Sequence, residues 1–330
     1  MNKRDSVLEG VLEATRLHAQ LGSPKRLHTD GNVDVFGVIV RMKLGLVFRP
    51  LKGLLGAYLP GDNPGILVTT ERPLSIQRFT GAHELGHFFM KHQGSLDDNS
   101  VIERSPFAKG YEPVEVAANS FAAAFLMPRW LLEHHAEKQH WTRSNFAETH
   151  TIYQLSLRVG TSYQATCWGL QQQGVLNIRD AKLLADIEVK GLKKQLLGER
   201  TLQSWHGNVW VLTEKDQGTL ICGEPHDVFI VRLKEQSGAG YLWDLDQVRA
   251  AGFNIVSDER VIPHHEKDVG GAVERVLTAK SEVPTMGNFE FLQRRPWDQS
   301  DVIGNFSLGY DLRGKEQGKP RAARENLPAA

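Results

Sequence analysis

The chain has 330 residues, of which 41% are hydrophobic and 24% are charged, a composition typical of a soluble globular protein with two domains. Lys plus Arg and Asp plus Glu number 39 each, so the formal net charge is zero, which argues against a dominant non-specific attraction to nucleic acid. Cys167 and Cys222 form neither a metal motif nor a disulfide framework. No stretch is long and apolar enough to cross a membrane, and the first residues lack the apolar core of a signal peptide. We therefore expect a cytoplasmic protein with reduced thiols and no membrane partner.

The first 70 residues predict one helix followed by a small sheet. Residues 6–20 carry apolar side chains at helical spacing, whereas the apolar segment 33–40 is compatible with a helix or a strand. Strands are predicted at 44–48, 57–59 and 66–70. We expect a small antiparallel sheet beside the next helix, with an edge strand that can pair with an extended substrate.

The next segment contains the motif H-E-x-x-H as His83, Glu84 and His87. Apolar residues recur around it at helical spacing, which predicts a buried helix. Positions four apart lie on one face of a helix, so the two His side chains can hold one metal ion. The metal in such motifs is most often zinc, and the Glu is then the general base of a metallopeptidase.

A catalytic zinc needs a third protein ligand and an open position. The segment 115–128 predicts a second helix, which ends at Pro128. Glu115, Asn119 and small residues share one face of it, so that face can approach another helix closely and Glu115 can reach the metal. The alternative is that Glu115 is a solvated residue in the first helical turn, where the helix dipole favours a negative charge.

The polar segment 93–113 lies between the two predicted helices and contains Gly and Pro residues. We interpret it as a mobile or disordered loop near the cleft. His92 follows the motif closely, and we interpret it as a structural or solvated residue.

The two motifs together resemble the ImmA/IrrE family of zinc metallopeptidases. The similarity extends from about residue 30 to about residue 178 and includes R-F-T-x-A-H-E-L-G-H and E-x-x-A-N-x-F-A-A-x-x-L-M-P. It implies one Zn²⁺ per chain, bound by His83, His87 and Glu115, with Glu84 as the catalytic base. Gly81 is a minor departure, since the family usually has a larger residue there.

Residues 149–175 have the spacing of a helix-turn-helix, with a turn at 159–161 and Ser162 as a helix N-cap. The second predicted helix, at 162–173, contains no Lys or Arg. Phosphate contacts dominate DNA affinity, so we expect this segment to be part of the peptidase fold and do not expect direct DNA binding.

The C-terminal half is rich in short β-type runs separated by turn residues, a pattern typical of an all-β sandwich. The runs are 208–212, 219–222, 227–233, 241–243, 253–256, 273–277, 288–292 and 306–308. A charged helical segment precedes them, and a polar tail from Gly314 lacks apolar periodicity.

Three short segments of this half resemble the chagasin-like inhibitors of papain-like cysteine peptidases, whose loops at one end of a β-sandwich enter the enzyme's active site. The similarity covers roughly residues 205–312. It implies a set of candidate partner-binding residues: Ser237, Gly238, Gly240, Tyr241, Gly270, Gly271, Arg295, Pro296 and Trp297. The central loop departs from the family's Asn-Pro-Thr-Thr-Gly, because residues 236–240 are Gln-Ser-Gly-Ala-Gly. We expect a sensing or docking role from these loops.

The predicted architecture is an α+β zincin-like metallopeptidase domain at 1–178, which includes the helix-turn-helix-like helices. A linker helix at 179–200 leads to an all-β, immunoglobulin-like sandwich at 201–313 and a disordered tail at 314–330. By resemblance, the protein substrate is a regulatory protein of the DNA-binding repressor or antitoxin type. Two other functions stay open, namely a DNA-binding regulator and an inhibitor of papain-like cysteine peptidases.

Overall fold

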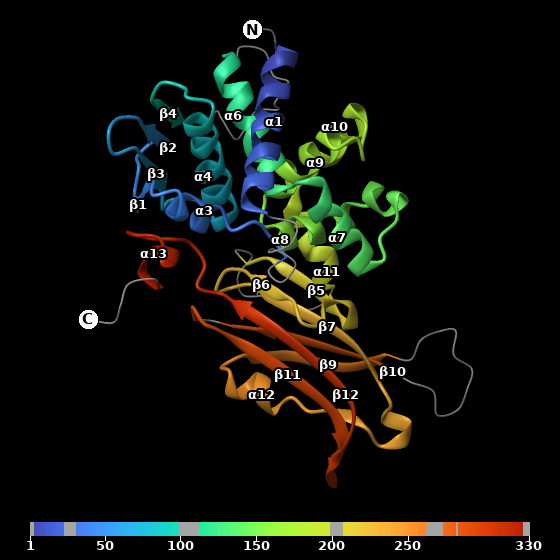
Figure 1. The fold of residues 1–330 in the computed structure, drawn as a ribbon. Coiled ribbons are helices and arrows are strands. Elements are labelled where there is room, and N and C mark those ends of the chain that lie inside the picture. The colour runs from blue at the N-terminus through green and yellow to red at the C-terminus, as the bar shows by residue number, and fades with distance from the viewer. Residues whose placement is uncertain are drawn as a thin grey trace. The chain divides into compact units, whose positions relative to one another are not determined.

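The computed structural model describes residues 3–22, 31–98, 112–198, 207–261, 273–281 and 283–325 (Figure 1). The chain divides into two compact units. The first, which we call the helical unit, comprises Met1–Glu137, Trp141–Ile187 and Lys315–Ala330. The second, the β-rich unit, comprises Lys138–His140 and Glu188–Gly314. The β-rich unit therefore interrupts the helical unit in sequence. None of the helices in the described ranges is long and apolar enough to cross a membrane.

A four-stranded mixed sheet lies in the helical unit. Its strands are β1 (Gly45–Arg49), β2 (Leu54–Leu59), β3 (Gly65–Thr69) and β4 (Ser95–Asp98), in the order β1-β3-β2-β4. β3 pairs in parallel with β1, whereas β2 pairs antiparallel with both β3 and β4. The antiparallel sheet that we predicted is thus wrong for one pair, because β3 is inserted between β1 and β2. The predicted loop 93–113 also contributes an edge strand, β4, within its described part.

Three helices pack against one another, α1 (Lys3–Leu21), α4 (Leu74–Phe89) and α6 (Pro113–Leu126), and α4 packs on β2 and β3 of the sheet. The ambiguous apolar segment forms a short helix, α3 (Val35–Arg41), whose N-cap Asp34 accepts a hydrogen bond from the Gly37 amide. Glycines permit the close helix contacts. A Cβ atom at Gly10 of α1 would lie 2.1 Å from the Ala117 carbonyl oxygen of α6, and one at Gly86 of α4 would lie 3.0 Å from the Phe121 ring. This packing brings α6 close to the helix that carries the H-E-x-x-H motif.

The remaining helices of this unit follow α6. They are α7 (Arg129–Gln139), the 3₁₀ helix η1 (Arg143–Ala147), α8 (Thr149–Val159), α9 (Tyr163–Gln172) and α10 (Ile178–Ala185). α8 and α9 form the predicted helix-turn-helix-like pair, with Gly160 in the left-handed conformation at the end of α8. Every side chain of α9 is buried or half-buried. The predicted single linker helix at 179–200 is instead divided, since α10 ends at Ala185 and α11 (Val189–Leu197) begins the β-rich unit.

The β-rich unit contains two four-stranded sheets, β5-β7-β10-β9 and β6-β12-β11-β8. The strands are β5 (Val209–Thr213), β6 (Leu220–Cys222), β7 (Val228–Glu235), β8 (Leu242–Trp243), β9 (Asn254–Val261), β10 (Val273–Lys280), β11 (Met286–Arg295) and β12 (Asp298–Asp311). Each of the eight predicted runs overlaps one of them, although most of the strands extend beyond the predicted bounds. The short helices η2 (Glu214–Asp216), η3 (Ser237–Ala239) and α12 (Asp246–Ala250) lie between strands.

Aromatic side chains join the two sheets of the β-rich unit. Phe253 contacts Phe229 of the first sheet, with ring centroids 5.9 Å apart, and Phe289 of the second sheet at 4.5 Å. Tyr310 of β12 stacks on Phe289 at 4.5 Å. All four rings are buried, so the hydrophobic core of this unit lies between the sheets.

The end of the chain returns to the helical unit. We predicted disorder from residue 314 onward, and this is wrong for residues 315–325. Glu316 is only 4% exposed, Gly318 forms a bridge with Phe48 of β1, and α13 (Arg321–Glu325) packs against α3. Figure 1 shows α13 beside the N-terminal sheet. Low hydrophobicity concealed this order, because the segment is held mainly by hydrogen bonds and an ion pair rather than by an apolar face.

Candidate metal centre

The H-E-x-x-H motif lies in the C-terminal half of α4, with both His side chains 1% exposed. The Nε2 atoms of His83 and His87 are 3.0 Å apart, since residues four apart in a helix lie one above the other. Their Nε2 atoms therefore point to one common position.

Glu115, in the first turn of α6, completes the cluster. Its carboxylate oxygens lie 3.2 Å from His83 Nε2 and 3.6 Å from His87 Nε2. The three donor atoms all lie within 4.8 Å of one another, and among the described residues they form the group of His, Cys, Asp and Glu side chains that could hold a metal ion. The Glu115 side chain is 22% exposed, so the cluster is not sealed from solvent.

This donor set fits zinc. Zinc bonds of about 2.0–2.1 Å in a tetrahedral site place neighbouring ligand atoms about 3.3 Å apart. The spacings of 3.0, 3.2 and 3.6 Å scatter around that value. Two imidazoles and one carboxylate also match the ligand types of catalytic zinc, which leave a fourth position open.

The other ring nitrogen of each His has its own partner. His83 Nδ1 lies 3.1 Å from the Asn119 Oδ1 atom, and His87 Nδ1 lies 2.9 Å from His92 Nδ1. A proton held on each Nδ1 by these contacts leaves the Nε2 lone pair directed at the centre. Burial lowers the pKa of His92, which favours the neutral ring whose Nδ1 can accept a hydrogen bond from the His87 Nδ1–H group.

We interpreted His92 as a structural or solvated residue, and the structure shows that its ring contacts the ring of His87. Asn119 was also missed as a partner of the centre. It stands four residues after Glu115 on the same helix face, and this spacing is the signal in the sequence that could have indicated it.

Glu84 is fully buried and lies against β2. A Cβ atom at Gly56 would lie 2.8 Å from the Glu84 Oε1 atom and 2.4 Å from Thr80 Cγ2. Only glycine therefore fits at this position while Glu84 keeps its place. Gly56 is a second residue that sequence reasoning missed, because its role depends on how β2 crosses α4.

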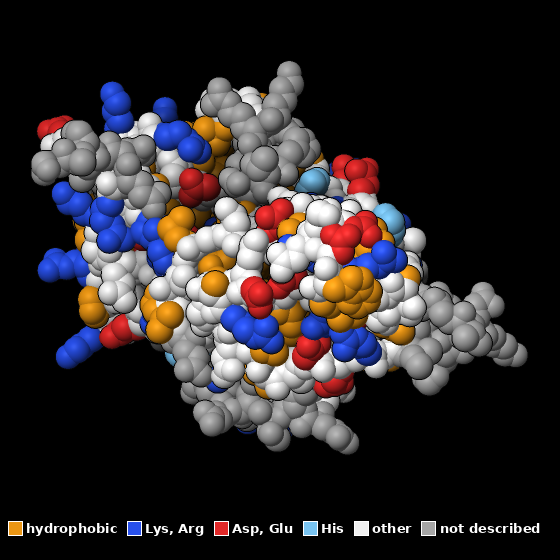
Figure 2. Space-filling view, turned by 90° about the horizontal axis from the view of Figure 1, so that it is seen from below, with side chains coloured by type: hydrophobic (Ala, Val, Ile, Leu, Met, Phe, Trp, Pro, Cys, Tyr) orange, Lys and Arg blue, Asp and Glu red, His pale blue; other side chains and the backbone are white. Residues whose placement is uncertain are grey.

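The candidate partner-binding residues of the β-rich unit are partly brought together. The Arg295 guanidinium stacks over the Tyr241 ring at 4.3 Å, and both side chains contact Asp301. A Cβ atom at Gly240 would lie 2.7 Å from the ring of Trp297, which is 75% exposed. The segments 237–241 and 295–297 thus lie side by side, whereas Gly270 and Gly271 lie outside the described residues. Figure 2 shows hydrophobic side chains reaching the surface among charged side chains of both signs.

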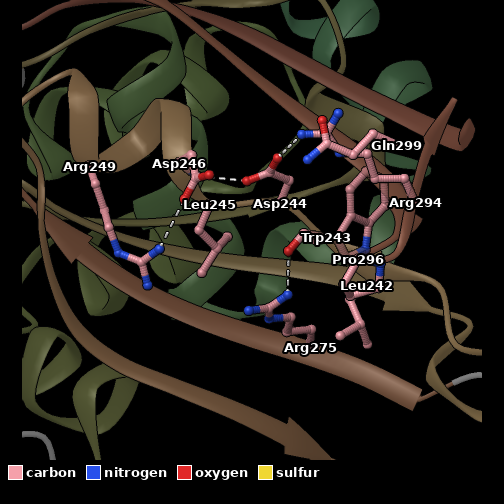
Figure 3. A pocket seen from close by; sticks show the side chains of 10 residues that line it. All are labelled: Leu242, Trp243, Asp244, Leu245, Asp246, Arg249, Arg275, Arg294, Pro296 and Gln299. Atoms are coloured by element: carbon pink, nitrogen blue, oxygen red, sulfur yellow. Dashed lines mark hydrogen bonds and ion pairs between the residues drawn. The ribbon is translucent and has the colours of Figure 1, made fainter.

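A cavity of about 310 Å³ lies next to these segments and is lined by Trp243, Arg275, Pro296 and neighbouring residues (Figure 3). Its charged groups are paired, Arg294 with Asp244, Arg249 with Asp246, and Arg275 with two carboxylates outside the lining. Arg275, which is 8% exposed, donates to both oxygens of Asp258 at 2.8 Å and to Glu235 at 2.9 Å. The hydrogen bonds from Arg275 hold the pKa of Asp258 below its usual range. This network supports the fold of the β-rich unit rather than a catalytic role.

Two family models match the chain. Residues 41–170 match the peptidase family model described as the IrrE N-terminal-like domain, and residues 224–309 match the chagasin family of peptidase inhibitors. The first match includes all of the metal-centre residues and points to protease activity. The second match covers most of the β-rich unit. A helical N-terminal region followed by a β-rich C-terminal domain agrees with the two family matches.

Two similar solved structures each cover about a third of this chain. A cysteine protease inhibitor from Entamoeba histolytica is 20% identical, covers 33% of this chain and 98% of its own, and has a TM-score of 0.29. The solution structure of Amebosin is 19% identical, covers 32% of this chain and 97% of its own, and has a TM-score of 0.27. No curated protein matches the chain in sequence.

Proposed function

We propose that this protein is a zinc-dependent endopeptidase whose zincin-like metal centre is formed by His83, His87 and Glu115. The observation that carries the proposal is the convergence of these three donor atoms within 4.8 Å, inside a segment that matches a peptidase family. Zinc at this position would polarise the scissile carbonyl and lower the pKa of a water molecule.

Residues of the chain transfer the proton and orient the two His rings. Glu84 accepts the proton of the attacking water and passes it to the leaving amine. Asn119 and His92 hold the Nδ1 protons of the two His residues and thereby orient their rings. Burial of α4 excludes bulk water from one side of the centre, while the partly exposed Glu115 leaves the other side accessible to a peptide.

Elemental analysis of the purified full-length chain tests the metal assignment. We expect about one zinc per chain, and a loss of zinc in His87→Ala and in Glu115→Gln, since each removes one ligand. Lys91→Ala is a matched control, because it changes an exposed side chain just after α4. Full zinc occupancy in both ligand variants would refute the ligand set.

We further propose a protein substrate, of the DNA-binding repressor or antitoxin type, with the β-rich unit as a sensing or docking domain. The exposed Trp297 beside the Arg295–Tyr241 pair supports a docking role, because Trp, Tyr and Arg are enriched at binding hot spots. Co-expression with the product of the neighbouring gene, followed by a search for cleavage fragments, tests the substrate class. Intact partner protein in the presence of the zinc-loaded chain would count against it.

Inhibition of a cysteine peptidase is the second candidate, favoured by the chagasin-family match over residues 224–309. The altered central loop at 236–240 weighs against it. A papain assay with the full chain and with Trp297→Ala separates the two roles. Tight inhibition that the substitution abolishes would establish the inhibitor, and the absence of inhibition would leave docking.

A DNA-binding function has little support from the fold. α9 carries no Lys or Arg and none of its side chains is exposed, so it presents no surface for a DNA groove. A gel-shift experiment on random duplex DNA at several salt concentrations tests this directly. Salt-dependent binding would reopen the DNA-binding alternative.

A further inference from the structure

The C-terminal segment, defined here as residues 315–325, is part of the helical unit although the whole β-rich unit precedes it in the chain. β12 ends at Asp311, and Glu316 is already buried in the helical unit. The polypeptide thus contributes its last described residues to the same unit as the metal centre.

The segment is attached to the helix of the metal centre through one side chain. Gln77, in α4, is fully buried. Its Oε1 atom accepts the Glu316 amide at 2.8 Å, and its Nε2 atom donates to the Glu316 carbonyl at 3.1 Å and to the Thr69 carbonyl at 2.9 Å. The side-chain oxygen of Gln77 and both of its N–H groups therefore form hydrogen bonds. Loss of the segment would remove the two bonds to Glu316, one at the oxygen and one at an N–H group, inside a buried site.

One further contact attaches the segment to β1 independently of Gln77, and another stabilises the segment internally. Gly318 exchanges two backbone hydrogen bonds with Phe48 of β1, at 2.8 and 3.0 Å. The Glu316 carboxylate accepts the Arg321 amide at 3.0 Å and pairs with the Arg321 guanidinium at 2.8 Å. The segment is therefore a built contact and not a chain end resting on the surface.

The position of Gln77 connects this contact to the metal centre. Gln77, Thr80 and Glu84 are spaced three and four apart and share the face of α4 that meets the sheet. Thr80 and Glu84 contact the site of Gly56 in β2, while Gln77 is bonded to the end of β3. The rotation of α4 about its axis, which sets where Glu84 and both His side chains point, is thus fixed at one end by Gln77 and Glu316.

We propose that Gln77 and the C-terminal segment are positioning elements of the metal centre, so that the peptidase unit is complete only with residues 315–325. The proposal rests on the proposed function in that it assumes a metal at His83, His87 and Glu115. It also implies that the β-rich unit is an insertion in the peptidase unit, attached to it at both ends.

The test uses the full-length chain and three variants. Gln77→Met removes the amide at similar volume. Gly318→Pro removes an N–H donor and cannot adopt the φ of +66° found at this position. Lys319→Ala is the matched control, since its side chain is exposed in the same segment. Each protein is titrated with Co(II), whose visible spectrum reports the geometry of the centre, and amide hydrogen exchange is measured along α4.

We expect Co(II) to bind about tenfold or more weakly in Gln77→Met and Gly318→Pro, with an altered spectrum and faster exchange in the first turns of α4. Lys319→Ala should match the wild type. Faster exchange with unchanged Co(II) affinity and spectrum would make the segment a stabilising contact only and overturn the positioning role. Unchanged values in every measurement would overturn the contact as well.

The experiment also distinguishes the case in which the proposed metal centre does not exist. In that case the wild-type chain itself binds no Co(II), whereas hydrogen exchange still shows whether the segment holds α4. If Gln77→Met does not fold, Gly318→Pro decides, because Gly318 lies at the surface and pairs with Phe48 in the edge strand β1.

Discussion

Gly56→Ala is the substitution whose effect follows most directly from the geometry of the site. The added Cβ would lie 2.4 Å from Thr80 Cγ2, 2.8 Å from Glu84 Oε1 and 3.0 Å from the Leu67 carbonyl oxygen. Real carbon contacts are about 3.5–4.0 Å, so at least one neighbour must move by about 1 Å. Overpacking of this kind lowers the free energy of unfolding by about 1–3 kcal/mol.

The effect on catalysis is expected to be larger than the effect on stability. A displacement of about 1 Å at a reacting group can reduce the rate about 100-fold. We therefore expect zinc to be retained, because the three atoms nearest to the added Cβ belong to no metal ligand, while kcat falls by about that factor. Thermal unfolding, zinc content and cleavage of the partner protein are measured on the same preparation.

Two further variants separate the causes. Gly65→Ala adds the same methyl group to the neighbouring strand, where the nearest atom is 3.5 Å away, and serves as the control. Thr80→Ser in the Gly56→Ala background removes one of the clashing atoms and should restore stability more than activity. If Gly56→Ala cleaves its substrate at the wild-type rate, Glu84 is not held as the structure indicates, and its role as the base loses its geometric support.

Three other predictions concern single groups. Glu84→Gln should keep zinc and fold but lose activity by about 100-fold or more, as measured by cleavage of the partner protein, and turnover near the wild-type rate would eliminate Glu84 as the base. His92→Ala should weaken zinc binding about tenfold, measured by competition with a chelator, whereas the exposed His226 serves as a control whose loss leaves affinity unchanged. Burial raises the pKa of Asp227 from 3.8 to about 6, so its neutral form is favoured in the fold. The contribution of Asp227 to the free energy of unfolding is fully present when the pH is below the pKa of the unfolded state, 3.8. It is lost as the pH rises through the folded pKa of about 6, and the loss lowers the free energy of unfolding by about 3 kcal/mol. Carboxyl NMR should show one aspartate titrating near that value, and its absence would contradict the raised pKa.

The return of the chain end also changes how a deletion should be designed. A truncation that removes everything after residue 199 takes away the partner of Gln77 together with the β-rich unit. Joining residue 187 to residue 315 instead keeps the C-terminal segment and removes residues 188–314 of the β-rich unit. A comparison of these two forms would show whether a loss of function comes from missing docking or from an incomplete peptidase unit.

Much of the metal centre could be predicted because its chemistry is local. H-E-x-x-H places two imidazoles on one helix face by the geometry of the helix alone, and the β-type runs of the second half depend on alternation and turn residues. Gly56 was not predicted, since its role depends on which strand packs against α4. The spacing places Asn119 on the same helix face as Glu115, but its contact with His83 depends on how α6 packs against α4. The antiparallel pairing predicted for β3 and the single linker helix predicted at 179–200 were wrong for the same reason, because strand order and helix breaks are set by tertiary packing.

The sequence by itself therefore determined the residue types of the centre, the two-part organisation and the β-rich character of the second half, all of which follow from spacing and periodicity. Only the tertiary structure decided that Glu115 reaches the two His residues, that Asn119 and His92 lie beside their Nδ1 atoms, and that Glu316 belongs beside Gln77. The physical reason is that these contacts join residues 5 to 239 positions apart in the chain. Hydrogen bonds over the longest of those separations leave no periodic signal in the sequence, so a polar segment that they hold in place looks the same as a disordered one.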